Sequence, residues 1–285
     1  MIQSGSTFSL GLKVRALRRL KVEPDWIIPQ WPVAERVHAV CTTRAGGMSQ
    51  PPYDSLNLGS HVGDHAMDVG QNRAVLSEAL HAKPVFLNQV HGCDVVRLTN
   101  STPHGTEADA CITQAAALAC TVMVADCLPV LFTNWQGDAV GAAHAGWRGL
   151  LGQGGVGVLE QSLKEFEALV PVSSAKSKTL VWLGPCIGSQ KFEVGDEVRD
   201  AFVAHDQSAL AMFTLHNNDK WLADLQGLAR LRLRALGLTQ IYGNDGSRRW
   251  CTVSNPSRFF SHRRDSVPLG GSGRMAACIW LGKYG

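Results

Sequence analysis

The sequence predicts an α/β fold, built as a single layered domain in which helices flank mixed β-sheets. Three observations lead to this prediction. Short runs of apolar and β-branched residues alternate along the chain with segments of helical periodicity. Hairpin-like turns between strand segments indicate antiparallel as well as parallel pairing. Of the 285 residues, 45% are hydrophobic and 18% are charged, the balance of a globular protein that buries its own core.

Local signals define the first elements. The run Val37–Thr43 predicts a strand, and residues 44–59 are so rich in Gly, Pro, Asn and Ser that a long loop is expected after it. Apolar side chains at helical spacing predict a helix over residues 65–82. The strand Val85–Leu87 then leads into the polar segment that contains His91.

The middle of the chain is dominated by buried strands. Segment Ala117–Asn134 is almost wholly apolar, which indicates two strands hinged at Asp126 and Cys127. We ascribe the break to Pro129, because proline cannot donate to a sheet ladder. A turn then leads into a further strand, Ala139–Ala143.

The remaining elements alternate between helices and strands. A stripe of Leu159, Leu163 and Phe166, with charged residues outside it, predicts an amphipathic helix. This helix is expected to follow the turn that ends at Gly149 and to run to about Leu169. After it we expect strand Thr179–Leu183, helices Val194–His205 and Ala223–Leu236, and a final strand or two ending at Trp280.

The charge distribution argues against nucleic acid as a partner. Residues 1–22 carry five basic side chains and no acidic one, and the rest of the chain holds 22 basic and 24 acidic residues, a net charge of −2. Nucleic acids bind proteins through basic surfaces that contact their phosphates. A net charge so close to zero over residues 23–285 does not predict such a surface. We expect residues 1–22 to be a flexible basic extension and residues 23–285 to form one catalytic domain.

Cysteine usage and hydropathy bear on location. The eight cysteines have no framework spacing, and no secretory signal precedes them, so they predict reduced thiols and a cytoplasmic protein. No apolar stretch reaches the roughly 18 residues that a membrane span needs, so no membrane partner is expected. The oligomeric state is left open.

Polar residues at the ends of buried strands form a candidate metal site. His91, Cys127 and His144 each lie where a predicted strand ends, and strand ends in one sheet converge on one edge. Two imidazoles and a thiolate suit Zn²⁺ and leave a fourth position open, as in catalytic sites. Cu²⁺ is the alternative, since the same ligand set binds blue copper. A multicopper oxidase would need His-x-His pairs, and this chain has none.

Five segments carry a family resemblance. They are Asn88–Gly92, Ala125–Pro129, His144–Gly149, Gly184–Gly188 and Phe259–Arg264. Together they resemble the YfiH-type laccase-domain family, also called purine nucleoside phosphorylase, polyphenol oxidase or peptidoglycan editing factor. The resemblance implies a YfiH/CNF-like fold and one zinc ion on His91, Cys127 and His144. It also implies phosphorolysis of adenosine, inosine and methylthioadenosine, with deamination of adenosine.

Four further residues are candidates for contacting purine nucleosides and phosphate. Arg44, in a Gly-rich loop, and Arg148, after His144, are expected to bind phosphate. Asn57 and Gln89 are expected to hydrogen-bond the base or the ribose. For each the alternative is a structural role: Arg44, Asn57 and Gln89 would hold loops, and Arg148 would cover Trp147.

Neighbouring polar residues are expected to stay outside the site. Asp126 is predicted to be a structural acceptor rather than a fourth ligand, because adjacent strand residues face opposite ways. Cys186 is expected to pack as a small buried residue, and Arg263 and Arg264 to form solvated ion pairs.

Three other functions remain open at this point. One is a copper polyphenol oxidase, and another is a metal-free cysteine hydrolase, with Cys127 as nucleophile, that edits peptidoglycan precursors. The last is an interaction protein that docks through its basic extension.

Overall fold

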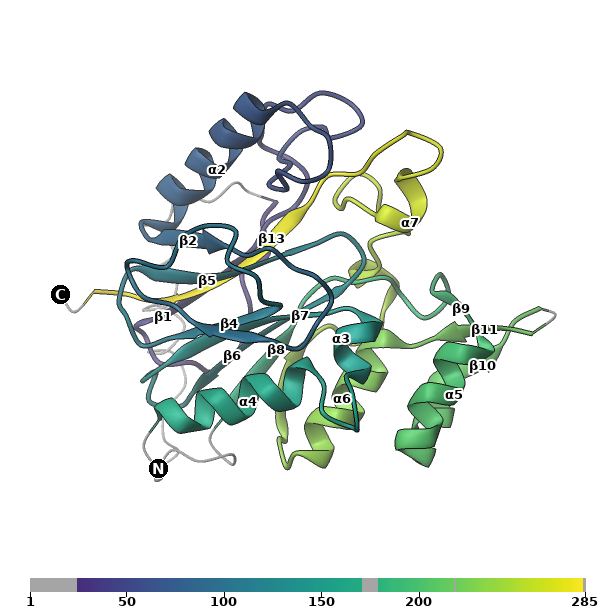
Figure 1. The fold of residues 1–285 in the computed structure, drawn as a ribbon. Coiled ribbons are helices and arrows are strands. Elements are labelled where there is room, and N and C mark those ends of the chain that lie inside the picture. The colour runs from purple at the N-terminus through teal and green to yellow at the C-terminus, as the bar shows by residue number, and fades with distance from the viewer. Residues whose placement is uncertain (1–24, 171–178, 218, 284–285) are drawn as a thin grey trace, which may run out of the picture.

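The computed structural model describes residues 25–170, 179–217 and 219–283, and these form stacked layers of helix, sheet, sheet and helix (Figure 1). Helix α2 (Ala66–Leu80) covers one outer face, and helices α4 (Val158–Leu169) and α6 (Leu225–Ala235) cover the other. The mixed α/β fold with mixed sheets is therefore confirmed. The predicted extension, residues 1–22, lies outside the described residues.

The first sheet joins strands from both ends of the described chain. In order across the sheet its members are β1 (Val37–Cys41), β13 (Met275–Leu281), β5 (Leu118–Val124) and β2 (Lys83–Phe86). Strand β13 is antiparallel to both β1 and β5, whereas β2 is parallel to β5. The last strand therefore lies inside the sheet, between strands that precede it by most of the chain.

The second sheet is larger and mixed. Its order is β12 (Gln240–Gly243), β8 (Thr179–Leu183), β6 (Leu128–Asn134), β7 (Val140–Ala145), β4 (Ala110–Thr113) and β3 (Val95–Arg97). The pairs β12–β8 and β3–β4 are parallel, and the pairs between them are antiparallel. The hairpin β6–β7 lies at its centre and carries one of the candidate ligands.

Burial of both faces explains why the central strands read as continuous apolar runs. On β5, Cys120 and Val122 point into the core between the sheets, while Ala119 and Met123 pack toward α2 (Ala66–Leu80). Side chains alternate along a strand, so a strand covered on both sides needs apolar residues at every position.

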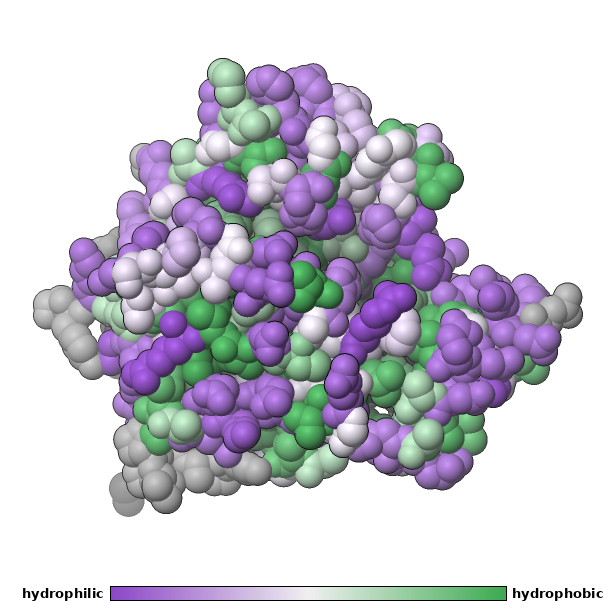
Figure 2. All heavy atoms as spheres, viewed as in Figure 1, coloured by the Kyte–Doolittle hydropathy of each residue, from purple (hydrophilic) through white to green (hydrophobic). Residues whose placement is uncertain are grey.

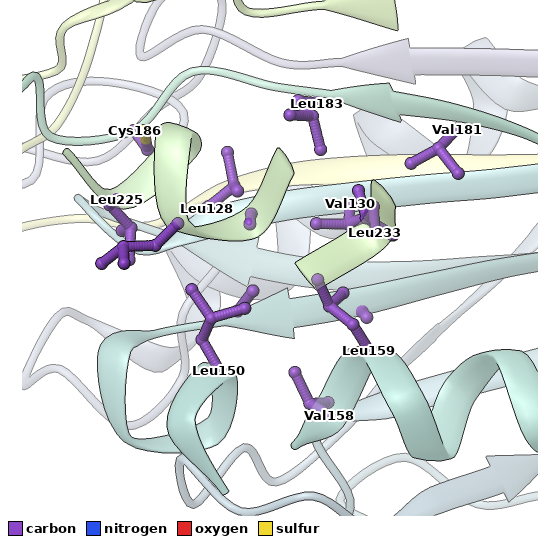
Figure 3. Packing of buried hydrophobic residues seen from close by; sticks show 14 of the residues in the cluster. Leu128, Val130, Leu150, Val158, Leu159, Val181, Leu183, Cys186, Leu225 and Leu233 are labelled. Atoms are coloured by element: carbon purple, nitrogen blue, oxygen red, sulfur yellow. The ribbon is translucent and has the colours of Figure 1, made fainter. Parts of the chain in front are cut away.

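The outer face of the second sheet packs on three helices. These are α3 (Trp147–Leu151), α4 (Val158–Leu169) and α6 (Leu225–Ala235). Figure 3 shows Leu150 and Leu159 approaching the sheet beside Leu225 and Leu233 of α6. All four side chains are at least 99% buried, so this cluster fixes the helices against the strands that carry the candidate site.

A small third sheet lies at the side of the molecule. It comprises β9 (Glu193–Gly195), β11 (Lys220–Ala223) and β10 (Phe213–Leu215), and it lies next to α5 (Asp196–His205). The remaining regular elements are the short helices η3 (Gln207–Met212), η4 (Arg248–Trp250) and α7 (His262–Asp265). Hydrophilic residues cover most of the face seen in Figure 2, with small hydrophobic areas between them. Among the described residues, no helix is both long and apolar enough to cross a bilayer.

Two local expectations were wrong. The helix expected over residues 149–169 is divided into α3 and α4, because Gly152 has a φ of 66° and a side chain there would meet the backbone of Val156. Pro129 does not break the strand pair but is the second residue of β6. The turn is made at Asp126, whose φ is 93°.

Close packing at Gly141 generates a stability prediction. Gly141 on β7 pairs with Phe132 on β6, and the Phe132 ring occupies the place where a Cβ would stand. We expect Gly141→Ala to lower the free energy of unfolding by about 1–3 kcal/mol, because the ring must move within a packed core. Urea denaturation measures the loss, and the double variant with Phe132→Leu should recover part of it. Unchanged stability of Gly141→Ala would contradict this packing.

Candidate functional site

Three separate segments bring His91, Cys127 and His144 together. His91 lies in the loop after β2, Cys127 in the turn between β5 and β6, and His144 in β7. Their ligand atoms all lie within 4.8 Å of one another, and Cys127 Sγ is 3.7 Å from His91 Nε2. Zinc bond lengths of about 2.0–2.3 Å in a tetrahedral site place neighbouring donors roughly 3.3–3.8 Å apart. The donor set and spacing therefore fit one metal ion.

His144 is held in one orientation by a buried carboxylate. Its side chain is almost fully buried, and its Nδ1 lies 2.8 Å from Asp109 Oδ1. This contact assigns the Nδ1 proton to the hydrogen bond with Asp109 and leaves Nε2 as the nitrogen available to a metal ion. His144 can thus act as a nitrogen ligand once Nε2 has given up its proton.

Asp109 also positions the loop that carries His91. Its carboxylate accepts hydrogen bonds from the backbone N–H groups of Val90 (3.1 Å), His91 (3.0 Å) and Gly92 (2.7 Å). Burial would raise the pKa of Asp109, but the hydrogen bond from His144 and those from the backbone bring it below its ordinary value. One ionised carboxylate therefore orients both histidines.

The sequence analysis missed Asp109. It is an acidic residue directly before the buried strand β4, and it is fully buried. An acidic residue at such a position is the only signal the sequence offers, and nothing in its spacing relates it to His91 or His144.

The metal-free site favours a thiolate and an imidazolium. Burial would raise the pKa of Cys127, but His144 and His91 together lower it to about 6. Burial would lower the pKa of His144, but Cys127 and Asp109 raise it to about 9. The thiolate is the form of cysteine that binds metal ions, so Cys127 is ready to coordinate at neutral pH.

Asp126 has the structural role predicted for it, for a different reason. Its backbone is left-handed at the turn, and its carboxylate accepts from Thr252 Oγ1, Ser261 Oγ (3.1 Å) and the Arg263 N–H (2.7 Å). The Ile187 N–H donates to its carbonyl oxygen. These bonds fix the turn that presents Cys127 and tie it to the start of α7.

A cavity of about 460 Å³ opens over the three ligands, a size typical of small-molecule sites. The lining is rich in cationic and imidazole side chains. In addition to the ligands, it includes His61, Gln89, Trp147, Arg148, Phe192, His262, Arg263 and Arg274. The only acidic residue in the described lining is Asp126, whose carboxylate is already hydrogen-bonded. The cavity is therefore suited to an anionic group.

The candidates Arg44 and Asn57 lie in the long loop, outside the described lining. Arg44 donates to the carbonyl oxygens of Asp54 and Pro256 and to the Asp54 carboxylate, and it stacks on Phe260. Asn57 is fully buried, and its Oδ1 accepts from the backbone N–H groups of Gly59 and Arg274. The contacts of both residues are those of loop-holding groups.

The candidates Gln89 and Arg148 do line the cavity. The Gln89 amide is paired with both backbone groups of Met123, at 2.9 and 2.7 Å. Arg148 is exposed, and its guanidinium stacks 4.4 Å from the centre of the Trp147 ring. Gln89 thus builds a wall of the cavity, whereas Arg148 has hydrogen-bond donors to offer a ligand.

Three neighbours were placed outside the site by the sequence analysis. Cys186 is buried, and burial raises the pKa of its thiol. Arg264 clamps backbone carbonyls and Asp265, so it too is structural. Arg263 was misplaced, because it lines the cavity. His61 and Arg274 were not identified at all, since no local pattern distinguishes them from surface residues, and His262 appeared only as part of the segment Phe259–Arg264.

Comparison with known sequences gives a consistent picture. A family model described as multi-copper polyphenol oxidoreductase laccase matches residues 38–282. The chain is 49% identical over 257 residues to the purine nucleoside phosphorylase YfiH of Escherichia coli, covering 90% of this chain and 98% of the relative. It is 46% identical over 257 residues to a purine nucleoside phosphorylase of Pseudomonas aeruginosa, with the same coverage.

Solved structures share the fold over nearly the whole chain. Protein NMB0706 of Neisseria meningitidis superposes with a TM-score of 0.81 and 41% identity, covering 91% of this chain and all of that one. YlmD of Geobacillus stearothermophilus gives a TM-score of 0.79 and 30% identity, covering 93% and 99% of the two chains.

The contacts of Asp109 predict a loss of metal affinity on substitution. Asp109→Asn should weaken zinc binding roughly 10- to 100-fold, because an amide cannot accept all the hydrogen bonds that orient the two histidines. It should also lower the free energy of unfolding by about 1–3 kcal/mol. Chelator competition and urea denaturation measure the two effects. Asp94→Asn, at an exposed neighbouring carboxylate, is the matched control. Equal zinc affinity in both variants would show that Asp109 does not orient the ligands.

The lowered pKa of Cys127 predicts selective alkylation. In metal-free protein the rate of iodoacetamide modification at Cys127 should rise as the pH passes about 6, because only the thiolate reacts. Peptide mass spectrometry identifies the modified residue. Cys93 is the internal comparison, since it is half-buried and burial with nearby acidic groups raises its pKa. Added zinc should protect Cys127, and a rate that rises only near pH 9 would disprove the assignment.

Proposed function

Because the chain belongs to the family described as multi-copper polyphenol oxidoreductase laccase, and its relatives include proteins named purine nucleoside phosphorylase, we propose that it phosphorolyses purine nucleosides with one metal ion. The observation that carries the proposal is the placement of a His₂Cys donor set at a cavity lined by cationic side chains. Such a cavity accommodates a small molecule together with a phosphate anion.

We assign zinc to His91, Cys127 and His144. The described residues contain one cluster of three ligating groups, whereas a multicopper oxidase would need several. Two imidazoles, a thiolate and an open position match catalytic zinc, and the hydrogen bond from His144 to Asp109 is the outer contact such ligands usually make. Zinc bound there would supply Lewis acidity at the floor of the cavity.

The cavity walls supply contacts for both substrates. Trp147 and Phe192 offer aromatic surfaces to a purine base, and Arg148 and Arg263 lie over these rings at 4.4 and 5.7 Å. Cationic side chains hold phosphate beside the ribose. A phosphate oxygen then bonds to C1′ as the bond from C1′ to the purine nitrogen breaks, and the departing base takes up a proton. Orientation of the two reactants is the main contribution of the protein.

The expected substrates are adenosine, inosine and methylthioadenosine, which share the purine and ribose parts. A slower deamination of adenosine to inosine is the accompanying activity. Soluble nucleosides and phosphate suit the expected cytoplasmic location. Gln89 and Asn57 are assigned to holding the walls and loops around these substrates rather than to contacting them.

A metal-free cysteine hydrolase is the second candidate. The observation in its favour is the pairing of Cys127 with His144, in which the thiol has a pKa of about 6. A thiolate beside an imidazolium is the arrangement that cysteine nucleophiles require. Asp109, which orients His144, would serve this chemistry equally well. Metal content of active protein therefore separates the two candidates.

The proposed reaction predicts phosphate-dependent release of adenine. Protein incubated with adenosine in phosphate buffer should form adenine and ribose 1-phosphate, measured by liquid chromatography. Cys127→Ala should lose both zinc and turnover, because thiolate ligation contributes much of the zinc affinity. Cys186→Ala, a buried cysteine outside the cluster, should keep its metal. Adenine formed equally fast without phosphate would rule out phosphorolysis, and activity without metal would favour the cysteine hydrolase.

A further inference from the structure

We propose that Arg274 and His61 form the subsite that binds the phosphate co-substrate, on the wall of the cavity near Cys127. The assignment rests on the proposed phosphorolysis and adds the residues that select the anion. The sequence pointed instead to Arg44 and Arg148. Arg274 precedes β13 and His61 lies in the long loop before α2, so the subsite joins two distant parts of the chain.

Arg274 is fixed along its whole length. Its backbone N–H donates to Asn57 Oδ1 at 2.8 Å, and its Cγ packs so closely on Gly59 that a Cβ there would come within 2.7 Å. Its Nη1 donates to the carbonyl oxygens of Ser272 (2.8 Å) and Gly273 (3.1 Å). A side chain ordered in advance loses little entropy when it binds a ligand.

The same guanidinium keeps donors for a ligand. In the described part of the chain, no acceptor contacts Nε or Nη2 of Arg274, and the His61 ring makes no hydrogen bond. Arginine retains its proton in proteins, so Arg274 remains a cation beside the cavity. Two free N–H groups on a planar fork match the paired oxygens of a phosphate.

Arg274 and His61 line the same cavity as the three candidate metal ligands. Burial lowers the pKa of Arg274, while the negative groups of Cys127 and Asp126 oppose that effect. Burial lowers the pKa of His61, as do the charges of Arg274, Arg73 and His144. A neutral His61 still offers one N–H to an anion without repelling Arg274. The subsite therefore combines one fixed cation with one neutral donor next to the catalytic floor.

The other cavity arginines are less suited to this role. Arg148 and Arg263 are exposed and lie over Trp147 and Phe192. Arg148 must give up side-chain freedom to hold an anion, and its stacking suits the base or the rim instead. Arg263 is tied by a hydrogen bond from its Nη1 to the Glu193 carbonyl oxygen (3.1 Å), but its exposed guanidinium stays screened by water. Arg44, outside the lining, has its donors committed to Asp54 and Pro256. Arg274 is thus the cavity arginine that combines anchoring, partial burial and free donors.

The test compares phosphate binding with catalysis in zinc-loaded protein. The variants are Arg274→Gln, Arg274→Lys and His61→Ala, with Arg263→Gln as a matched loss of one positive charge in the same cavity. Inorganic phosphate is titrated by calorimetry and by its effect on the melting temperature, and the KM values for phosphate and adenosine are measured separately. For each variant, the melting temperature measured without phosphate shows whether the protein is folded, and the zinc content shows whether the metal site is occupied.

Arg274→Gln should weaken phosphate binding roughly 10- to 100-fold, the effect of losing charge-assisted hydrogen bonds, with a much smaller change in the KM for adenosine. Arg274→Lys should restore part of the affinity, since it keeps the charge but not the fork. His61→Ala should weaken binding less, and Arg263→Gln least. Wild-type phosphate affinity in folded Arg274→Gln would overturn the proposal, as would an equal loss in Arg263→Gln.

The outcome is independent of the reaction assigned above. If phosphate binds through Arg274 but adenosine is not phosphorolysed, the subsite stands and the proposed function fails. If adenosine is phosphorolysed and Arg274→Gln leaves the KM for phosphate unchanged, the function stands and the subsite fails.

Discussion

The buried carboxylate of Asp109 is the contact on which the candidate site depends. Removing a carboxylate from water is costly unless its oxygens accept hydrogen bonds, and here three backbone amides and one imidazole donate to them. The hydrogen bonds that offset the cost of burying the carboxylate are the same bonds that order the loop and the imidazole. Asp109 thus fixes the backbone of the loop that carries His91 and the ring of His144.

A second carboxylate links the metal ligands to the wall of the cavity. Asp126 bends the chain directly before Cys127 and binds the backbone at Arg263, which lies in the cavity lining. The turn before the Cys127 thiolate and the backbone at Arg263 are therefore held by the same carboxylate. Such coupling favours a site in which metal and anion are positioned relative to each other.

The sequence predicted the layered fold and the clustering of His91, Cys127 and His144, but not the groups that orient them. Polar residues such as Cys127 stand out against long apolar strands, whereas Asp109 and Arg274 acquire their roles only through pairing of distant segments. Strands β3, β9 and β10 have three residues each, too few for an alternating pattern to show. The single helix expected up to residue 169 was wrong, because the spacing of apolar residues does not show that Gly152 has a positive φ, which interrupts the helix.

The interior position of β13 has a consequence for how the protein is made. During synthesis β1 and β5 emerge long before the strand that separates them, so the first sheet cannot close until β13 has left the ribosome. Arg274, directly before β13, arrives at the same late moment. A nascent chain therefore contains His91, Cys127 and His144 before it contains Arg274 of the cavity wall. The first sheet and the cavity are therefore completed together, and until β13 is made the facing edges of β1 and β5 stay unpaired.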